Sequence, residues 1–141
     1  MSTTTNLSAS AYLDLRNYIQ STYLYVEITD SSDTQITRLQ IGGSDGRAVW
    51  SHTTGANPMQ LTITLKGSDS DIPNPSTIGG LYLHETSSDT TRKNEAVALT
   101  VFTIQSTSDS LTITAQISLP ATTTATTITS DMVGETVTIV S

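Results

Sequence analysis

Two histidines, His52 and His84, are the side chains of this 141-residue chain that could act as a general base near neutral pH. Serines are numerous, so a hydroxyl group close to either ring is expected by chance. Ser44 stands in a G-x-S-x-G match, residues 42–46, but this GGSDG stretch reads as a turn between two strands rather than the strand-to-helix turn that presents an activated nucleophile. We therefore predict no catalytic residue and no enzymatic activity, and we keep a small hydrolase centred on His52 or His84 as an alternative.

Aspartates gather in three stretches that read as turns, and carboxylates are the ligands that calcium prefers. These stretches contain Asp30 with Asp33, Asp69 with Asp71, and Asp109. None follows the D-x-[DN]-x-[DN]-G spacing with a closing glutamate. Two histidines without any cysteine are too few for a structural zinc site. We predict no metal and no cofactor, and we interpret residues 68–71 as a solvated turn, while calcium binding at the aspartate-rich turns stays open.

A third candidate is a set of aromatic side chains, since stacked aromatic rings bind sugars. The set comprises Tyr12, Tyr18, Tyr23, Tyr25, Trp50 and Tyr82. These residues fall on different predicted faces, which favours positions in the core or at its rim. Trp50 in particular is expected to be a core anchor whose N–H group is hydrogen-bonded. A carbohydrate-binding module remains an alternative function.

The composition favours an all-β protein. Serine and threonine make up roughly a third of the chain, far above ordinary usage, and they suit turns and strands respectively. The formal net charge is -7 with only six basic residues, of which Arg92 and Lys93 form the one adjacent pair. Phosphate binding requires clustered basic side chains, so nucleic acid is not an expected partner. No apolar run is long enough for a membrane span, and the first ten residues lack the features of a secretory signal.

The strongest structural signal lies between residues 80 and 120. Apolar residues alternate with polar ones over residues 81–85, 96–104 and 111–119, which predicts three consecutive strands joined by polar turns. Pro120 then ends the last strand, because proline cannot donate a ladder hydrogen bond. We expect these strands to form a meander to which the other strands are added.

The remaining elements extend this sheet into a single domain. Residues 10–22 read as a helix, capped by Ser8 or Ser10, that covers one end of the sandwich, with Arg16 on its wetter side. Further strands are predicted at residues 23–29, 35–41, 47–52, 61–65 and 137–140, with a bulge near Thr37 and Arg38. Residues 67–80 read as a long irregular loop. The predicted fold is mainly β, an antiparallel β-sandwich or barrel with one short N-terminal α-helix. Its segments are an arm (1–9), the helix (10–22), the sandwich (23–120) and a C-terminal arm or strand (121–141).

The order GLYL, polar turn, AVALTVF, polar turn, SLTITAQISLP resembles part of certain bacteriophage virion proteins. In those proteins a short Gly-Leu-Tyr strand precedes an alanine-valine strand and a final alternating strand. The helix that runs into YLYVEITD, followed by a strand and KGSDSDI, is also similar to small phage virion proteins. The resemblance implies a β-sandwich or barrel that assembles on a virus particle. It could act as a capsid decoration (cement) protein or as an attachment domain of a tail or neck fibre.

Fibre proteins continue into long repeats, which this chain does not contain, so the decoration role is favoured. The implied partners are other virion proteins, either capsid or tail subunits, and further copies of the chain in a homo-oligomer such as a trimer. The implied location is the virion, after synthesis in the host cytoplasm. Polar, β-prone termini would make the contacts, since strand addition is one way in which extended segments bind.

Overall fold

The computed structural model describes residues 2–97, 99–120, 129–131 and 134–140. These residues form one helix and nine strands, in the following order: α1 (Ala9–Thr22), β1 (Tyr25–Asp30), β2 (Gln35–Gln40), β3 (Ala48–Trp50), β4 (Met59–Lys66), β5 (Ser76–His84), β6 (Phe102–Ile104), β7 (Ser110–Ser118), β8 (Thr129–Asp131) and β9 (Gly134–Val140). No helix among them is long and apolar enough to cross a membrane.

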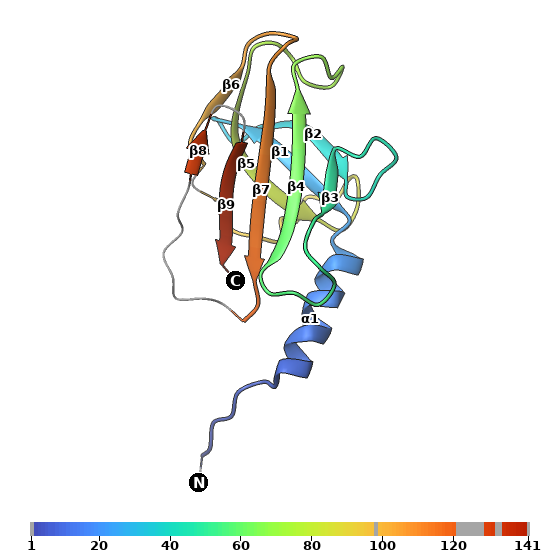
Figure 1. Ribbon diagram of the computed structural model, residues 1–141, viewed down its shortest axis with the longest axis vertical. Coiled ribbons are helices and arrows are strands. Elements are labelled where there is room, and N and C mark those ends of the chain that lie inside the picture. Colours follow the sequence, from blue (N-terminus) through green and yellow to red (C-terminus); the bar gives the residue numbers. More distant parts are fainter. Residues whose placement is uncertain (1, 98, 121–128, 132–133, 141) are drawn as a thin grey trace.

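The strands form two sheets that face one another across a common core (Figure 1). The four-stranded sheet has the order β2-β1-β5-β6, and the five-stranded sheet has the order β3-β4-β7-β9-β8. The predicted mainly β fold with one short N-terminal helix is thus confirmed, and it takes the form of a sandwich. Neighbouring strands run antiparallel except β7 and β9, which are parallel. A tight hairpin cannot join parallel neighbours, and β8 lies between β7 and β9 in the sequence.

Period-2 alternation builds the core, as the sequence predicts. Along β7, Leu111, Ile113, Ala115 and Ile117 are buried, and they lie opposite buried residues of β4 in register. Val26 and Ile28 of β1, which belongs to the other sheet, are fully buried in the same core. Burying one such aliphatic side chain stabilises the fold by about 1.5–3 kcal/mol, so this layer supplies the main driving force.

The predicted three-strand meander is wrong in two respects. Of the described residues between 96 and 104, only those of β6 form a strand, and β7 belongs to the opposite sheet rather than lying beside β6. The physical reason lies at the edge of β5, where Asn94 replaces a neighbouring strand. Its side chain accepts from the Leu83 N–H at 2.7 Å and donates to the Leu81 carbonyl at 3.1 Å. β6 therefore pairs only with the first residues of β5, from Ser76 to Ile78.

Three local predictions can be compared directly with the structure. The loop predicted over residues 67–80 is wrong at its end, since β5 already begins at Ser76. The bulge predicted near Thr37 lies one residue earlier: Ile28 pairs with Thr37 and Thr29 with Gln35, which leaves Ile36 unpaired. Predicted strand 137–140 is confirmed as part of β9, whereas residues 121–128 of the C-terminal segment lie outside the described residues.

The helix begins at Ala9, one residue before the predicted start, and Ser8 is its N-cap. The Ser8 hydroxyl accepts a hydrogen bond from the Ala11 N–H at 3.2 Å. Residues 2–8 precede the helix without secondary structure and are exposed. Figure 1 shows that α1 projects beyond one end of the sandwich and that the preceding residues lead farther away. The prediction that the helix covers this end is therefore wrong for most of its length.

Candidate functional site

The aspartates of the predicted calcium turns direct their carboxylates at neighbouring backbone groups. Asp30 accepts hydrogen bonds from the N–H groups of Ser32 and Thr34 at 2.8 and 2.9 Å. Asp109 accepts from those of Gln105 and Ser106 at 2.7 and 2.9 Å. Carboxylates engaged in this way close turns, and within the described part of the chain no group of histidines and acidic residues has the arrangement of a metal site.

Asp69 and Asp71 lie beside Arg47 instead of forming a cation site. The Arg47 guanidinium donates to Asp71 Oδ1 at 2.8 Å and to Asp45 Oδ2 at 2.9 Å, and it lies 3.4 Å from Asp69 Oδ2. Hydrogen bonds from Arg47 hold the pKa of the Asp71 carboxyl below its ordinary value. The side chains border an open hollow of about 590 Å³, which the positively charged guanidinium lines together with the three carboxylates.

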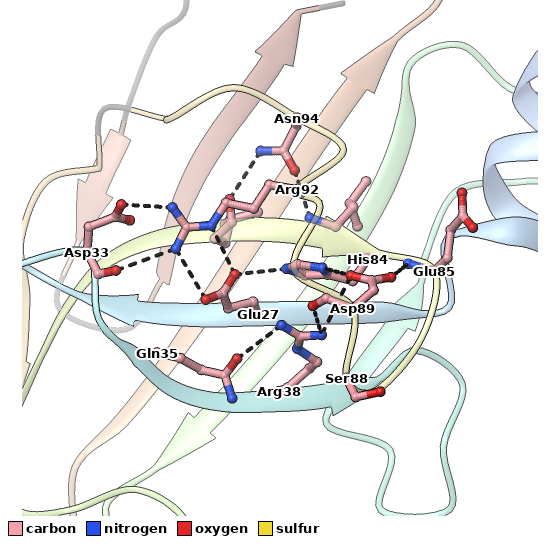
Figure 2. Close-up of polar contacts among 12 residues, drawn as sticks. Glu27, Asp33, Gln35, Arg38, His84, Glu85, Ser88, Asp89, Arg92 and Asn94 are labelled. Carbon is pink, nitrogen blue, oxygen red and sulfur yellow. Dashed lines mark hydrogen bonds and ion pairs between the residues drawn. The ribbon is translucent and has the colours of Figure 1, made fainter.

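A second polar cluster lies on the outer face of the four-stranded sheet, around His84 (Figure 2). His84 ends β5 and its side chain is 1% exposed. Its Nε2 lies 2.8 Å from Glu27 Oε1 of the neighbouring strand β1, and its Nδ1 is hydrogen-bonded to Asp89 of the following loop. Both ring nitrogens therefore face carboxylate oxygens, which accept but cannot donate while they are ionised.

Two arginines complete this cluster. Arg92 donates to both Glu27 carboxylate oxygens, at 3.1 and 3.2 Å, and to Asp33 at 2.8 Å. Arg38 of β2 donates to the Asp89 backbone carbonyl at 2.9 Å and lies 3.7 Å from the Asp89 carboxylate. The cluster thus connects β1, β2 and β5 with the loop of residues 85–94, and it fastens that loop across the sheet.

The surroundings keep the two carboxylates of this cluster ionised. Burial raises the pKa of the Glu27 carboxyl, but the hydrogen bonds from Arg92 and His84 outweigh it, and the pKa lies below its ordinary value of 4.5. At Asp89, burial also raises the pKa, but hydrogen bonds from the Thr86 N–H and His84 lower it to about 2. Ionised carboxylates that are hydrogen-bonded by these side chains make a structural cluster, whose members depend on one another.

These shifts predict that the fold loses stability in acid. A carboxyl group whose pKa is lowered by folding stabilises the native state above its unfolded pKa, and this contribution disappears as the pH falls through the folded value. For Glu27 and Asp89 the loss is expected between about pH 4.5 and pH 2. Urea unfolding across this range measures it, and an Asp89→Asn variant should show a smaller decrease than the parent chain. A free energy of unfolding that stays constant or increases toward pH 2 would contradict the assignment.

Neither histidine has the surroundings of a general base. His84 has both ring nitrogens bound to carboxylates, with no serine hydroxyl among its hydrogen-bond partners. The His52 ring accepts from the Gln60 N–H through Nδ1 at 3.0 Å and stacks edge-on against Trp50, with ring centroids 5.6 Å apart. In the part of the chain that the structure describes, neither histidine is hydrogen-bonded to a serine hydroxyl group. Ser51, which precedes His52 in the sequence, is hydrogen-bonded to Thr62 instead.

The aromatic residues do not gather into one platform. Tyr82 is buried under the Arg92 guanidinium, which lies 3.8 Å from its ring centroid. Tyr18 and Tyr23 form an edge-to-face pair at the C-terminal part of α1, with centroids 6.4 Å apart. Trp50 is half-buried and packs against the core, as predicted in part, but its buried Nε1 has no hydrogen-bond partner among the described residues, so the predicted hydrogen bond of its N–H group is wrong. Strand β3 lies at a sheet edge, where Ala48 is buried, Val49 is exposed and Trp50 is half-buried.

The surface that remains is the helix itself. None of the 14 residues of α1, all of which the structure describes, is buried. Leu15 is 40% exposed and Tyr18 57%, and Leu7 just before the helix is 55% exposed. Apolar residues are also exposed outside this element, with Val101 57% and Leu24 40% exposed.

The helix is held to the body by one arginine and two apolar contacts. Arg16 donates to the Leu119 carbonyl at 2.6 Å and to the Gly55 carbonyl at 3.1 Å, so its prediction as a solvated residue is wrong. Ile19 and Tyr23 pack against the core from outside. A helix of this length is marginal alone in water, so these contacts define its direction, whereas its exposed apolar residues are left without a partner in the monomer.

Sequence reasoning did not single out Glu27, Arg38, Asp89 and Arg92 as a group. The available signal was an acidic residue on the outward face of a predicted strand together with the adjacent basic pair that contains Arg92.

The comparisons add no family: a scan against protein-family models finds no match, and the searches of curated proteins and of solved structures find no similar chain.

Proposed function

We propose that this protein is a non-enzymatic structural component of a virus particle, and specifically a capsid decoration (cement) protein that binds an assembled shell. The observation that carries the proposal is the exposed N-terminal region: residues 2–8 make no secondary structure, and the helix that follows has no buried residue. A rigid sandwich with a projecting arm suits a subunit that attaches to a larger assembly. The virion itself is inferred from the resemblance of the strand and loop segments to small phage proteins.

The polar clusters support a structural role. The charged side chains around His84 and Arg47 are hydrogen-bonded to one another and to the backbone, where they fasten loops to the sandwich. Residues 2–7 contain three threonines in succession, and threonine favours extended conformations. We infer that this segment adds to an exposed strand or groove of a shell subunit, where main-chain hydrogen bonds would hold it.

Deletion of residues 1–7 is expected to abolish binding to shells without changing the stability of the domain. Ser8 is kept, so the helix keeps its cap, and the deleted residues that the structure describes are exposed. Binding is measured by co-sedimentation with empty shells of the virus that encodes the chain, and stability by thermal unfolding of the isolated variant. Undiminished co-sedimentation of the deletion variant would refute the arm mechanism.

A second experiment tests the location independently of the arm. Antibody labelling of purified particles should show the protein on the capsid surface under the decoration hypothesis and on the tail or neck under the fibre alternative. Particles that carry none of it would end the proposal. A glycan array, with Tyr18→Ala as the comparison, tests the carbohydrate-binding alternative separately.

A further inference from the structure

The buried ring of His84 lies between two carboxylates, and each of them requires a hydrogen-bond donor. The side chain is 1% exposed, its Nε2 lies 2.8 Å from Glu27 Oε1, and its Nδ1 is hydrogen-bonded to Asp89 Oδ1 (Figure 2). An ionised carboxylate only accepts hydrogen bonds, whereas a neutral imidazole has one N–H group and one nitrogen that only accepts. Both contacts can therefore exist together only when the ring carries a proton on each nitrogen.

Neither carboxylate supplies the second proton, because other donors hold each of them in its ionised form. Arg92 donates to both carboxylate oxygens of Glu27. The Oδ2 atom of Asp89 accepts from the N–H groups of Glu85 and Thr86, both at 2.9 Å. Burial raises the pKa of both carboxyls, but these hydrogen bonds outweigh it and hold each pKa below its ordinary value. The second proton of the cluster therefore belongs to the imidazole ring.

The two contacts of the ring differ in what they join. Glu27 belongs to β1, which pairs with both β2 and β5, so its carboxylate is fixed in position. Asp89 belongs to the loop of residues 85–94, which has no helix or strand. We propose that the doubly protonated ring of His84 is a latch on this loop, and that loss of one ring proton as the pH rises releases the loop from the sheet. A ring with a single proton keeps its contact to the fixed carboxylate, and its bare nitrogen then repels Asp89.

Other charged and titratable groups surround the ring on each element packed against it. They are Tyr25, opposite His84 in the register of β1, Arg38 of β2, and Arg92 and Lys93 of the loop. Arg38 Nη1 lies 3.7 Å from Asp89 Oδ1, beyond hydrogen-bond distance, and Lys93 pairs with Glu85 at 3.0 Å. Among the described residues, only the ring donates a hydrogen bond to Asp89 Oδ1, so no neighbour replaces the latch.

Release of the loop would uncover surfaces that the closed form withholds. On the outer face of the sheet, Glu27 and Tyr82 are each only 6% exposed, although both are polar. The loop also covers the edge of β5, since the Lys93 N–H donates to the Leu83 carbonyl at 3.0 Å and the Asn94 side chain accepts from the Leu83 N–H. An uncovered strand edge is a place at which another strand can pair. The latch therefore controls access to this edge, whatever the protein binds through its arm.

Nitrogen NMR of the imidazole rings at neutral pH tests the protonation directly. Both ring nitrogens of His84 should carry protons. His52 is the internal comparison, because its Nδ1 accepts from the Gln60 N–H at 3.0 Å and should be unprotonated. A His52→Gln variant assigns the two sets of signals. An unprotonated nitrogen on the ring of His84 at neutral pH would overturn the inference.

Limited digestion with trypsin measures release of the loop, because Arg92 and Lys93 are cleavage sites within it. The closed loop binds the proton that the open loop releases, so raising the pH favours opening. Cleavage at these sites, relative to a free peptide of residues 88–97 in the same buffer, should therefore increase above neutral pH by up to about tenfold per pH unit, the slope for one proton. A relative cleavage rate that does not increase with pH would contradict the proposal.

A matched pair of variants identifies the group responsible. Asp89→Asn should abolish the pH dependence, because an amide whose oxygen faces the two backbone N–H groups can donate to a bare Nδ1, so the loop no longer requires the second ring proton. Asp109→Asn makes the same change in a turn of the same kind, where the carboxylate accepts from the N–H groups of Gln105 and Ser106. This control should keep the pH dependence of the parent chain. The same pH response in both variants would show that the ring is not the latch, and circular dichroism verifies that each variant keeps the sandwich.

Discussion

Replacement of Glu27 by glutamine is expected to lower the free energy of unfolding by about 1.5–3 kcal/mol, the usual contribution of hydrogen bonds made to a charged group. The Glu27 side chain is 7% exposed and accepts hydrogen bonds from both His84 and Arg92. Glutamine has nearly the same size but no charge, so the half-buried Arg92 guanidinium loses one of its two carboxylate partners and the buried His84 ring loses the carboxylate at Nε2. The loop of residues 85–94 should loosen as a consequence, because it is fastened through Arg92 and Asp89.

The measurement is equilibrium unfolding in urea, with Glu85→Gln as the matched control. Glu85 also pairs with a basic residue, Lys93, at 3.0 Å, but its side chain is 43% exposed. Exposed ion pairs contribute little, so this control should unfold close to the parent midpoint. Equal midpoints for the Glu27 and Glu85 variants would show that the cluster does not hold the loop. A double-mutant cycle that combines Glu27→Gln with Arg92→Met isolates the energy of the Glu27–Arg92 contact.

Replacement of Gly67 by alanine is expected to be at least as damaging, with a loss of about 4 kcal/mol or more. An added Cβ at this position would lie 1.8 Å from the Ser106 carbonyl oxygen and 2.7 Å from its carbonyl carbon. The two loops are joined here by a hydrogen bond from the Gly67 N–H to the Asp109 carbonyl at 2.9 Å. Both contacts involve backbone, which cannot move aside as the end of a flexible side chain can.

The control for this effect is Gly46→Ala. Gly46 has a φ of +68°, which costs an L-residue about 1–2 kcal/mol, but a Cβ there would meet no atom within 4 Å. Thermal or urea unfolding of the two variants therefore separates backbone strain from the steric overlap between loops. If the two alanines lower the stability equally, the close approach at Gly67 does not restrict the fold.

Local rules were sufficient for the elements whose signals lie within a few residues. The alternation along β4 and β7 requires only neighbouring positions, and so does the capping of α1 by Ser8. The mainly β class followed from these patterns together with the serine and threonine content. Side chains that alternate between two environments leave a period in the sequence whether or not the partner strand is known.

Contacts between distant residues account for the errors. Which sheet receives β7 depends on its pairing with β4, and the extent of β6 depends on the Asn94 side chain that occupies the edge of β5. The cluster around His84 joins Glu27 with Arg92, which are 65 residues apart, and no spacing rule connects them.

The same distinction applies to the candidate surface. The amino-acid order alone established a β protein and a capped amphipathic helix, because both depend on local periodicity. The tertiary structure decided which stripe of that helix is covered, because Arg16 can reach its carbonyl partners only once the loop at Gly55 and the end of β7 are folded together. The exposure of Leu15 and Tyr18 is a consequence of that docking.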